Sequence, residues 1–354
     1  MTTDFKKKLN DFLLASAEKG ASDLHISPGY YPTMRIDGRL IPAVDYGVMD
    51  IKTIDAMADS ILGDRKSHFD EQHEADFSYE LNDQLRFRTN VYRTRGHSAI
   101  VFRLIPQKIK TLAELGMPKS IEIFTKISQG FVLVVGPNGH GKSTTMAAII
   151  DQINHERAEK IITLEDPIEY LFVPEKSIID QRELYADTLS FSNALRAAVR
   201  ENVNIVMIGE MRDYETMSAA VSAAETGHLV LASLHTNNAA QTVERIVDSF
   251  PPNQQPQIIA QLADTISGVV SQRLIPRIKG GLAPAAEVMI ANPAVRNLIR
   301  EGKFNQLNLA IDTGSEVGMI SLNRSLADLV KRQEITLEQA EFYSLNPSEL
   351  RKLV

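Results

Sequence analysis

A glycine-rich segment followed by a lysine and a serine carries the strongest chemical signal in this sequence. Residues Gly136–Ser143 read G-P-N-G-H-G-K-S and match the pattern G-x-x-x-x-G-K-[ST] without a gap. In such a loop, glycines let backbone N–H groups wrap a phosphate, and the start of the following helix adds a favourable dipole. The lysine, here Lys142, reaches the β- and γ-phosphates, and the hydroxyl of Ser143 holds Mg²⁺. The loop residues expected to contact the nucleotide are Gly136, Asn138, Gly139, His140, Gly141, Lys142, Ser143 and Thr144.

Two acidic clusters follow apolar segments that we expect to be strands. Glu165 and Glu169 follow the first segment, and Glu210 follows the second, Ile205–Ile208. The carboxyl end of a parallel strand is where an α/β sheet places its ligand. A carboxylate there can polarise water for attack on a γ-phosphate or hold Mg²⁺ through water. Glu210 is the preferred catalytic candidate, because an unpaired charge directly after a buried strand is costly.

Two aspartates in these clusters have a simpler explanation as helix caps. Asp166 precedes Pro167, and Asp213 stands where the next helix is expected to begin. An aspartate accepts hydrogen bonds from the free N–H groups of a first helical turn, and proline is favoured at the first helical position. We therefore expect Asp213 to cap a helix rather than to act in catalysis.

Two histidines flank the apolar segment Leu229–Leu234. His228 and His235 are seven residues apart, so on an extended strand they point to opposite faces, which argues against a shared metal site. Either could be a hydrogen-bonded core histidine. His235 stands at the expected strand end beside the phosphate loop, so a role in sensing the γ-phosphate or a subunit edge is the competing interpretation.

The chain from residue 119 alternates apolar strands with helices, which predicts a parallel sheet covered on both faces. The expected strands are 131–135, 160–164, 205–208 and 229–234, and the helices between them are 142–155, 190–200 and 213–226. From about residue 237 the pattern reads mostly helical. The later helix signals cover 239–249, 254–273, 294–300, 321–332 and 336–343.

Residues 1–105 predict a smaller domain of mixed helices and strands, joined to the domain at 119–354 by a linker over 106–118. Apolar spacing indicates helices from Phe5 to Leu13 and over 51–62, and a meander of strands over 76–81, 85–92 and 98–105. In the middle strand, Arg86 and Arg88 alternate with apolar residues. We therefore expect an antiparallel sheet with one buried face and one arginine-bearing face.

The composition narrows the class of protein. The chain has 354 residues, enough for about two domains. It has no cysteine, which excludes disulfides, thiolate zinc sites, iron–sulfur clusters and a cysteine nucleophile. Its net charge of −7 provides no overall basic surface, so we expect no nucleic-acid partner. No apolar run reaches the roughly 18–20 residues that span a bilayer, so we expect a cytoplasmic protein without membrane insertion.

Four segments, taken in order, make the chain resemble the secretion-type ATPases of bacterial pilus and type II secretion machines. They look like the Walker A, aspartate, Walker B and histidine boxes of that family, and they are Gly136–Ser143, Thr163–Glu169, Asn204–Asp213 and Thr226–His235. Ala21–His25 also resembles the opening strand of the family. Ala294–Glu301 is similar to a late helical signature of the pilus-retraction branch. The resemblance covers nearly the whole chain.

The resemblance implies an α/β fold with three parts. A RecA-like P-loop core with a parallel sheet is preceded by a smaller α+β, PAS-like N-terminal domain. A helical C-terminal segment follows, from about residue 254 to 354. The family's cofactors would be ATP and Mg²⁺.

The resemblance also implies roles for individual residues. Glu210 orients the attacking water, and Glu169, together with Glu165, supports the network of water around the Mg²⁺ on Ser143. His228 and His235 face the nucleotide or the neighbouring subunit. The arginine-bearing N-terminal domain would bring two residues to the phosphates, Arg88 and Arg103. The simpler alternative is that both form surface ion pairs with acids such as Asp76 or Glu80.

The implied function is a ring motor, expected to be a hexamer, that hydrolyses ATP and powers type IV pilus retraction and twitching motility by disassembling pilin subunits. Its expected partner is the pilus platform protein of the inner membrane, at whose cytoplasmic face it would act. The main alternative is a pilus extension or type II secretion ATPase. Those relatives typically carry a tetracysteine zinc insertion, which the absence of cysteine disfavours. A retraction-accessory paralogue is disfavoured by the Ala294–Glu301 segment.

Two further alternatives are not motors. A non-hydrolysing, nucleotide-gated assembly scaffold would keep Lys142 and Ser143 but would not need Glu210. A small-molecule kinase would need an acceptor domain or lid, of which the sequence gives no sign. The presence of Glu210 and Glu169 therefore favours turnover.

The chain departs from the family pattern in two places. The turn before the Walker B strand usually reads E-D-P-D, and here it is Glu201-Asn202-Val203-Asn204. In the phosphate loop, His140 replaces a usual serine. Because the loop acts through backbone amides, we expect it to tolerate the histidine.

Overall fold

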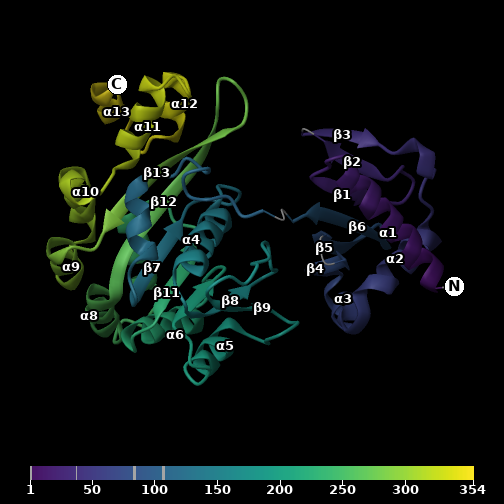
Figure 1. Cartoon of the computed structure of the whole chain (residues 1–354), viewed down its shortest axis with the longest axis horizontal. Coiled ribbons are helices and arrows are strands. Elements are labelled where there is room, and N and C mark those ends of the chain that lie inside the picture. The colour runs from purple at the N-terminus through teal and green to yellow at the C-terminus, as the bar shows by residue number, and fades with distance from the viewer. Residues whose placement is uncertain (1, 37, 83–84, 106–107) are drawn as a thin grey trace. The chain divides into compact units, whose positions relative to one another are not determined.

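The computed structural model describes residues 2–36, 38–82, 85–105 and 108–354. Pro106 and Gln107, at the start of the predicted linker, lie outside the described residues. The chain forms two compact units, drawn in Figure 1. The N-terminal unit consists of Met1–Lys108 and Asp166–Leu171, and the C-terminal unit consists of Ile109–Glu165 and Phe172–Val354.

The N-terminal unit is built on a six-stranded antiparallel sheet in the order β3-β2-β1-β6-β5-β4. Its strands are β1 (Asp23–Ile26), β2 (Thr33–Ile36), β3 (Arg39–Pro42), β4 (Glu74–Asn82), β5 (Leu85–Thr94) and β6 (His97–Leu104). Its helices are α1 (Thr2–Glu18), α2 (Ile51–Leu62) and α3 (Lys66–Gln72). Both predicted helices and all three strands of the predicted meander are present.

The core of this unit forms where the apolar faces of α1 and α2 meet the sheet. Phe12 of α1, Met57 of α2, Phe87 of β5 and Phe102 of β6 are buried in one cluster. The predicted alternation in β5 is confirmed, because Phe87, Thr89 and Val91 are buried while the intervening Arg88 stays partly exposed. The second face of the sheet therefore carries arginines.

The C-terminal unit is built on a seven-stranded sheet in the order β13-β12-β7-β11-β10-β8-β9, in which only β13 is antiparallel to its neighbour. Its strands are β7 (Gly130–Val135), β8 (Lys160–Glu165), β9 (Ile178–Glu183), β10 (Ile205–Ile208), β11 (Leu229–Leu234), β12 (Ile266–Pro276) and β13 (Leu282–Ile290). The first helices of this unit are α4 (Lys142–Glu156), α5 (Phe191–Ala198), α6 (Tyr214–Glu225), α7 (Ala239–Asp248) and α8 (Gln255–Thr265). The predicted parallel core is therefore confirmed.

One of the predicted helices is wrong. The segment 254–273 was expected to be helical, but helix α8 ends at Thr265 and the chain continues as β12 and then β13. Strand β12 is buried almost throughout, so it carries no polar alternation that would mark it as a strand. The helical C-terminal segment begins only after β13. It consists of α9 (Pro293–Arg300), α10 (Leu307–Thr313), α11 (Leu322–Lys331), α12 (Leu337–Tyr343) and α13 (Pro347–Leu353).

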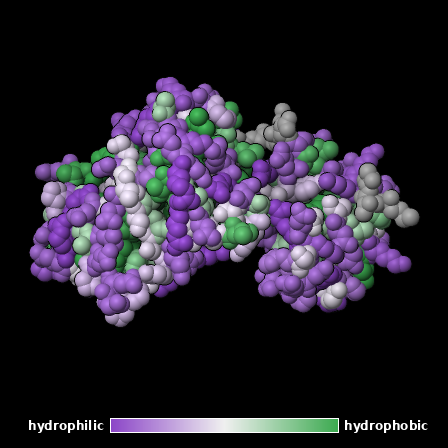
Figure 2. Space-filling view, turned by 90° about the horizontal axis from the view of Figure 1, so that it is seen from below, coloured by the Kyte–Doolittle hydropathy of each residue, from purple (hydrophilic) through white to green (hydrophobic). Residues whose placement is uncertain are grey.

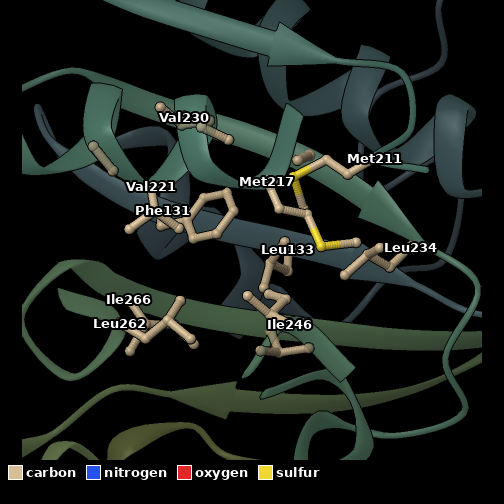
Figure 3. Close-up of a cluster of buried hydrophobic side chains, with 14 of the residues drawn as sticks. Phe131, Leu133, Met211, Met217, Val221, Val230, Leu234, Ile246, Leu262 and Ile266 are labelled. Atoms are coloured by element: carbon tan, nitrogen blue, oxygen red, sulfur yellow. The ribbon is translucent and has the colours of Figure 1, made fainter. Parts of the chain in front are cut away.

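A large apolar cluster fixes the central strands against the helices of this unit. Figure 3 shows Phe131 and Leu133 of β7 facing Met217 of α6 and Ile246 of α7, and all four side chains are buried. Burying a side chain of this size stabilises the fold by about 1.5–3 kcal/mol. The loops that leave the ends of these strands therefore start from rigid positions.

The surface seen in Figure 2 is mostly hydrophilic, with small separate apolar areas. Among the described residues, no helix has the length and apolar character needed to cross a membrane.

Candidate functional site

The P-loop (Gly136–Ser143) connects β7 to α4, as the sequence predicts. Gly136, Gly139 and Gly141 have φ angles of 146°, 76° and 81°, a region that favours glycine. A Cβ atom on Gly136 would lie 2.5 Å from the backbone oxygen of Gln272 in β12. Gly136 is therefore required by the close approach of strand β12. Gly141 is the N-cap residue of α4.

Lys142 folds back into the loop that it terminates. Its Nζ donates hydrogen bonds to the carbonyl oxygens of Gly136 and Pro137, both at 3.0 Å, and lies 3.2 Å from Nδ1 of His235. An ammonium group can only donate, so Nδ1 of His235 accepts and Nε2 carries the hydrogen of the neutral ring. The buried lysine thus holds its charge directly at the phosphate loop.

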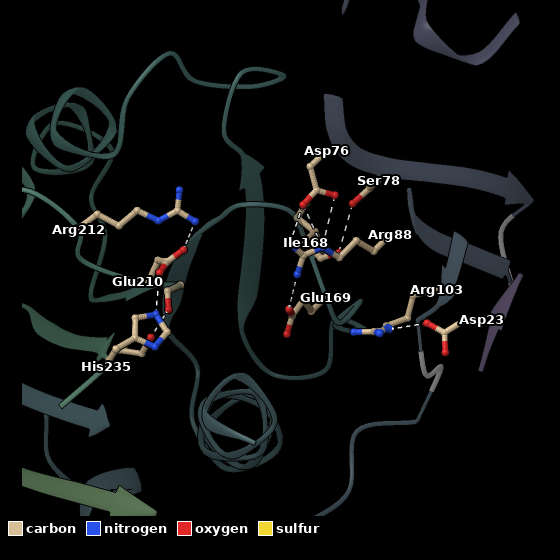
Figure 4. Close-up of polar contacts among 12 residues, drawn as sticks. Asp23, Asp76, Ser78, Arg88, Arg103, Ile168, Glu169, Glu210, Arg212 and His235 are labelled. Carbon is tan, nitrogen blue, oxygen red and sulfur yellow. Dashed lines mark hydrogen bonds and ion pairs between the residues drawn. The ribbon is translucent and has the colours of Figure 1, made fainter. Parts of the chain in front are cut away.

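Glu210 lies two residues beyond the end of β10 and meets His235, which follows β11. His235 Nε2 lies 3.0 Å from Oε2 of Glu210, and Arg212 forms an ion pair with Oε1 (Figure 4). Burial raises the pKa of the Glu210 carboxyl, but the hydrogen bonds from Arg212 and His235 outweigh it and place the pKa below the ordinary value. Glu210 is therefore an ionised acceptor, linked through His235 to Lys142.

Glu165 closes β8 and is buried at the same end of the sheet. Its Oε1 accepts hydrogen bonds from Oγ1 of Thr163 at 2.7 Å and from Nε2 of Gln181 at 3.1 Å. These contacts hold the carboxylate in a fixed orientation. The structure thus places Glu165 and Glu210 at the carboxyl ends of neighbouring strands, β8 and β10.

Glu169 belongs to the short segment that groups with the N-terminal unit. Arg88 donates from Nη1 to Oε1 of Glu169 at 3.2 Å and from Nη2 to Oδ2 of Asp76 at 2.6 Å, while Ser78 donates to the carbonyl of Ile168 at 3.2 Å (Figure 4). Ile168 and Glu169 are thus joined to strands β4 and β5 of the same unit by direct polar contacts.

Arg103 pairs with a different acid. Its Nε donates to Oδ1 of Asp23 at 2.8 Å, and 69% of its side chain is exposed. Surface pairing of both arginines with nearby acids was the simpler interpretation of Arg88 and Arg103. Asp76 is one of the acids expected for that role, and Asp23 is not.

Comparisons with known proteins agree with this geometry. A model of the family described as "Type II/IV secretion system protein" matches residues 3–306. The chain belongs to the type II/IV secretion system protein family.

Individual relatives place it further within this family. The type IV pilus retraction ATPase PilT of Pseudomonas aeruginosa is 43% identical over 333 residues, which cover 94% of this chain and 96% of that protein. A twitching motility protein of Neisseria gonorrhoeae is 42% identical, with 90% and 86% coverage. A crystal structure of the pilus retraction motor PilT with bound ADP matches with a TM-score of 0.89 and 43% identity, covering 97% of this chain and 98% of that chain. The predicted family is confirmed, and the chain is a P-loop ATPase that uses nucleotide.

One residue of the histidine box, His228, lies away from the P-loop of this secretion ATPase. His228 stands at the start of β11, where Gly130 opens the neighbouring strand β7, whereas the P-loop follows the other end of β7. Nδ1 of His228 contacts the carbonyl of Ala223 at 3.0 Å. The structure therefore brings His235, but not His228, to Lys142 and Glu210.

The two aspartates predicted as possible caps differ. Asp213 caps α6, accepting a hydrogen bond from the backbone N–H of Thr216 at 2.7 Å, as predicted. Asp166 does not cap a helix, because no helix begins at Pro167. The chain bends at Asp166 and Pro167 and continues without regular secondary structure.

Three residues at the site were missed by the sequence analysis. Arg212 stands two residues after Glu210 and could have been found from that spacing. Gln272 and Arg273 lie on β12 beside the P-loop, and the wrong helix prediction over 254–273 hid them.

The hydroxyl of Ser143 and the ionised carboxylate of Glu210 suit a hydrated Mg²⁺. Among the described residues, no group of three or more histidines, aspartates or glutamates could hold a metal alone. Mg²⁺ keeps several waters and binds one or two protein oxygens plus substrate phosphates, so it does not need such a cluster. The hydroxyl of Ser143, at the start of α4, suits that role.

Proposed function

We propose that this P-loop ATPase is the motor that retracts type IV pili by disassembling pilin subunits. The observation that carries the proposal is the Lys142–His235–Glu210 series, which joins a phosphate-binding loop to an ionised strand-end carboxylate. The names of two relatives, a pilus retraction ATPase and a twitching motility protein, supply the process.

In the proposed reaction, Lys142 exchanges its carbonyl partners for the β- and γ-phosphates of ATP. Glu210 accepts a hydrogen bond from the attacking water, while His235 and Arg212 hold its carboxylate in orientation. Bound Mg²⁺, held by Ser143 and through water by Glu210 and Glu169, would neutralise the phosphate charge. Glu165 supports this network from β8.

The working form in this proposal is a homo-oligomeric ring, expected to be a hexamer, acting on the inner-membrane pilus platform from its cytoplasmic side. Arg88 and Arg103 would supply positive charge to the triphosphate, and His228, away from the P-loop, suits a neighbouring subunit better than its own nucleotide. Light scattering in the presence of ATP tests the ring. A strictly monomeric protein with full activity would contradict it.

Two variants test whether Lys142 serves nucleotide binding and Glu210 serves hydrolysis. Lys142→Ala is expected to nearly abolish nucleotide binding, because it removes the cation at the phosphates. Glu210→Gln is expected to bind ATP normally and to lose turnover, because an amide no longer provides a carboxylate acceptor for the water. Affinity is measured with a fluorescent ATP analogue and turnover by phosphate release. Full turnover by Glu210→Gln would remove Glu210 from the mechanism.

The process itself needs a cellular test. The gene is expressed in a bacterium whose pilus retraction ATPase has been deleted, and twitching and surface piliation are scored. Restored twitching supports retraction, and restored pilus assembly in an extension-deficient strain would favour the extension or secretion alternative. The Glu210→Gln variant separates a motor from a non-hydrolysing scaffold in the same strains, because only a scaffold would still complement.

A further inference from the structure

His140 accepts a backbone hydrogen bond from β12 at a point where β12 has no neighbouring strand on the β7 side. Strand β12 pairs with β7 only as far as Ser271 opposite Val135, because β7 ends there and the P-loop begins. Three residues further along β12, the backbone N–H of Leu274 donates to Nδ1 of His140 at 2.9 Å. The imidazole therefore replaces the missing strand partner.

A buried glutamine strengthens the same connection. Gln272 is 1% exposed and donates from Nε2 to the carbonyl of His140 at 2.6 Å. Its Oε1 accepts from Oγ1 of Thr145, in the first turns of α4, at 2.8 Å. One residue of β12 thus fixes both the P-loop and the helix that follows it.

The ring of His140 also meets the C-terminal helices. It packs edge-on against Tyr343, the last residue of α12, with centroids 6.3 Å apart. Helix α12 is itself attached to the end of β12, because Nε2 of Gln339 donates to the carbonyl of Pro276 at 3.1 Å. Figure 1 shows α11, α12 and α13 beside the far part of the β12–β13 hairpin.

Only a neutral imidazole can serve both contacts. Nδ1 must be unprotonated to accept from Leu274. Burial lowers the pKa of His140, and the nearby cations Arg273 of β12 and Lys142 of α4 lower it further.

We propose that His140 is a positioning residue that ties the P-loop to β12 and α12, so that the C-terminal helices control the affinity of the loop for ATP. This inference rests on the proposed ATPase site and names a regulatory input to it. A serine at this position has no ring to reach Tyr343, so the link belongs to this chain. Because His140 contacts the loop backbone and not the reacting atoms, its loss is expected to change affinity more than the chemical step.

Replacements at His140 separate the acceptor from the ring. Asparagine carries its Oδ1 at the same number of bonds from Cα as histidine carries Nδ1, so His140→Asn keeps the bond to Leu274 and loses the ring contact. His140→Ala loses both. We expect His140→Ala to raise the KM for ATP about three- to tenfold, as the loss of one hydrogen bond does, with kcat within about twofold. His140→Asn keeps the hydrogen bond but loses the ring contact, so its KM is expected to rise as much as that of Tyr343→Leu and less than that of His140→Ala.

Hydrogen–deuterium exchange gives a readout that needs no nucleotide. The amide of Leu274 is expected to exchange faster in His140→Ala and to keep its protection in His140→Asn. Equal protection of this amide in wild type and His140→Ala would overturn the proposal, even if the protein hydrolysed no ATP. If the wild-type protein hydrolysed no ATP, that result would instead refute the proposed function.

The coupling to α12 is tested by a double-mutant cycle. Tyr343→Leu is expected to raise the KM in the wild-type background and to have no effect in the His140→Asn background, where the ring is already absent. Leu345→Ala, at an exposed residue two positions after the end of α12, is the matched control and is expected to leave the KM unchanged. An equal effect of Tyr343→Leu in both backgrounds would show that Tyr343 acts without His140.

Discussion

At the scale of single residues, the site depends on a histidine that touches both charged partners. Nδ1 of His235 faces Lys142 and Nε2 faces Glu210, at 3.2 and 3.0 Å. Without the imidazole, Glu210 keeps Arg212 as its ion-pair partner but loses the contact that aligns it with the P-loop. The histidine therefore orients the carboxylate by donating a hydrogen bond to it.

We expect His235→Ala to lower kcat about 10²-fold, at the lower end of the effect of a positioned acid–base group. ATP affinity should change much less, because Lys142 remains and loses one of its acceptors to solvent. Phosphate release and binding of a fluorescent ATP analogue measure the two effects. His155→Ala, an exposed histidine in the last turn of α4, is the control and should match wild type. An unchanged kcat in His235→Ala would leave His235 with a structural role only.

At the scale of elements, the loop that carries His235 is held by a buried acid on β13. Oε1 of Glu287 accepts from the backbone N–H of Ala239 at 2.8 Å, at the start of α7. Burial raises the pKa of Glu287 to about 7, against the lowering effect of this hydrogen bond and of Arg273. Arg273 in turn donates from Nη2 to the carbonyl of Asn237 at 3.1 Å.

This raised pKa predicts a pH dependence of stability. Between about pH 4.5, the ordinary value, and about pH 7, the folded chain keeps a proton on Glu287 that the unfolded chain has released. The contribution of Glu287 to the free energy of unfolding therefore falls as the pH rises through this window, by about 3 kcal/mol at most. In Glu287→Gln, which cannot ionise but can still accept from Ala239, this part of the pH dependence should vanish.

Urea denaturation of wild type and Glu287→Gln at pH 5 and pH 8 measures the difference between the two slopes. The variant should gain relative stability at pH 8. Identical pH dependence in the two proteins would mean that Glu287 titrates in the folded state as it does in the unfolded chain.

The elements also show what the sequence could predict. The P-loop with its flanking strand and helix, the alternation in β5 and the cap at Asp213 follow from local patterns, and all three are present. Strand β12 could not be separated from a helix, because a strand buried on both faces has no polar period. Edge strand β9 (Ile178–Glu183) mixes polar and apolar residues without a clear pattern and was not predicted.

The candidate site was predictable where it depends on strand ends. Glu210 and His235 were both assigned from their position after an apolar strand. The link from Glu210 through His235 to Lys142, and the contacts of Gln272 and Arg273 behind the loop, depend on the order of strands in the sheet. That order is set by tertiary packing, and one chain's local pattern does not contain it.

At the scale of the whole molecule, the question is how two compact units work as one motor. In the N-terminal unit, Arg88 forms ion pairs with Asp76 and Glu169. The more exposed Arg103 forms an ion pair with Asp23. The pairs of Arg88 are partly exposed, and surface ion pairs are worth about 1 kcal/mol or less, so a triphosphate can compete for this guanidinium. Asp23 is buried, but it also contacts Ser22 and Arg35, so it keeps partners when Arg103 binds a phosphate instead. Arginine also suits phosphate oxygens, because its planar fork binds two of them.

We expect Arg103→Ala to lower turnover by about 10³-fold if Arg103 reaches the triphosphate in the transition state, as an arginine finger does. The melting temperature should hardly change, because the Arg103 side chain is mostly exposed and its partner Asp23 keeps its contacts with Ser22 and Arg35. In a ring, the finger would come from a neighbouring subunit. An interface then works when one subunit supplies Glu210 and the other supplies Arg103.

Mixing two inactive variants tests this arrangement. In an equal mixture of Glu210→Gln and Arg103→Ala subunits, about a quarter of the interfaces in a cyclic assembly would combine an intact Glu210 with an intact Arg103. Turnover should therefore recover on mixing, to a level that follows the mixing ratio. Arg196→Ala, an arginine of α5 in the C-terminal unit, replaces Arg103→Ala in the control, and this variant should be active alone. If the mixture stays as inactive as its parts while light scattering shows mixed assemblies, Arg103 acts within its own subunit, because that arrangement gains nothing from a neighbour's arginine.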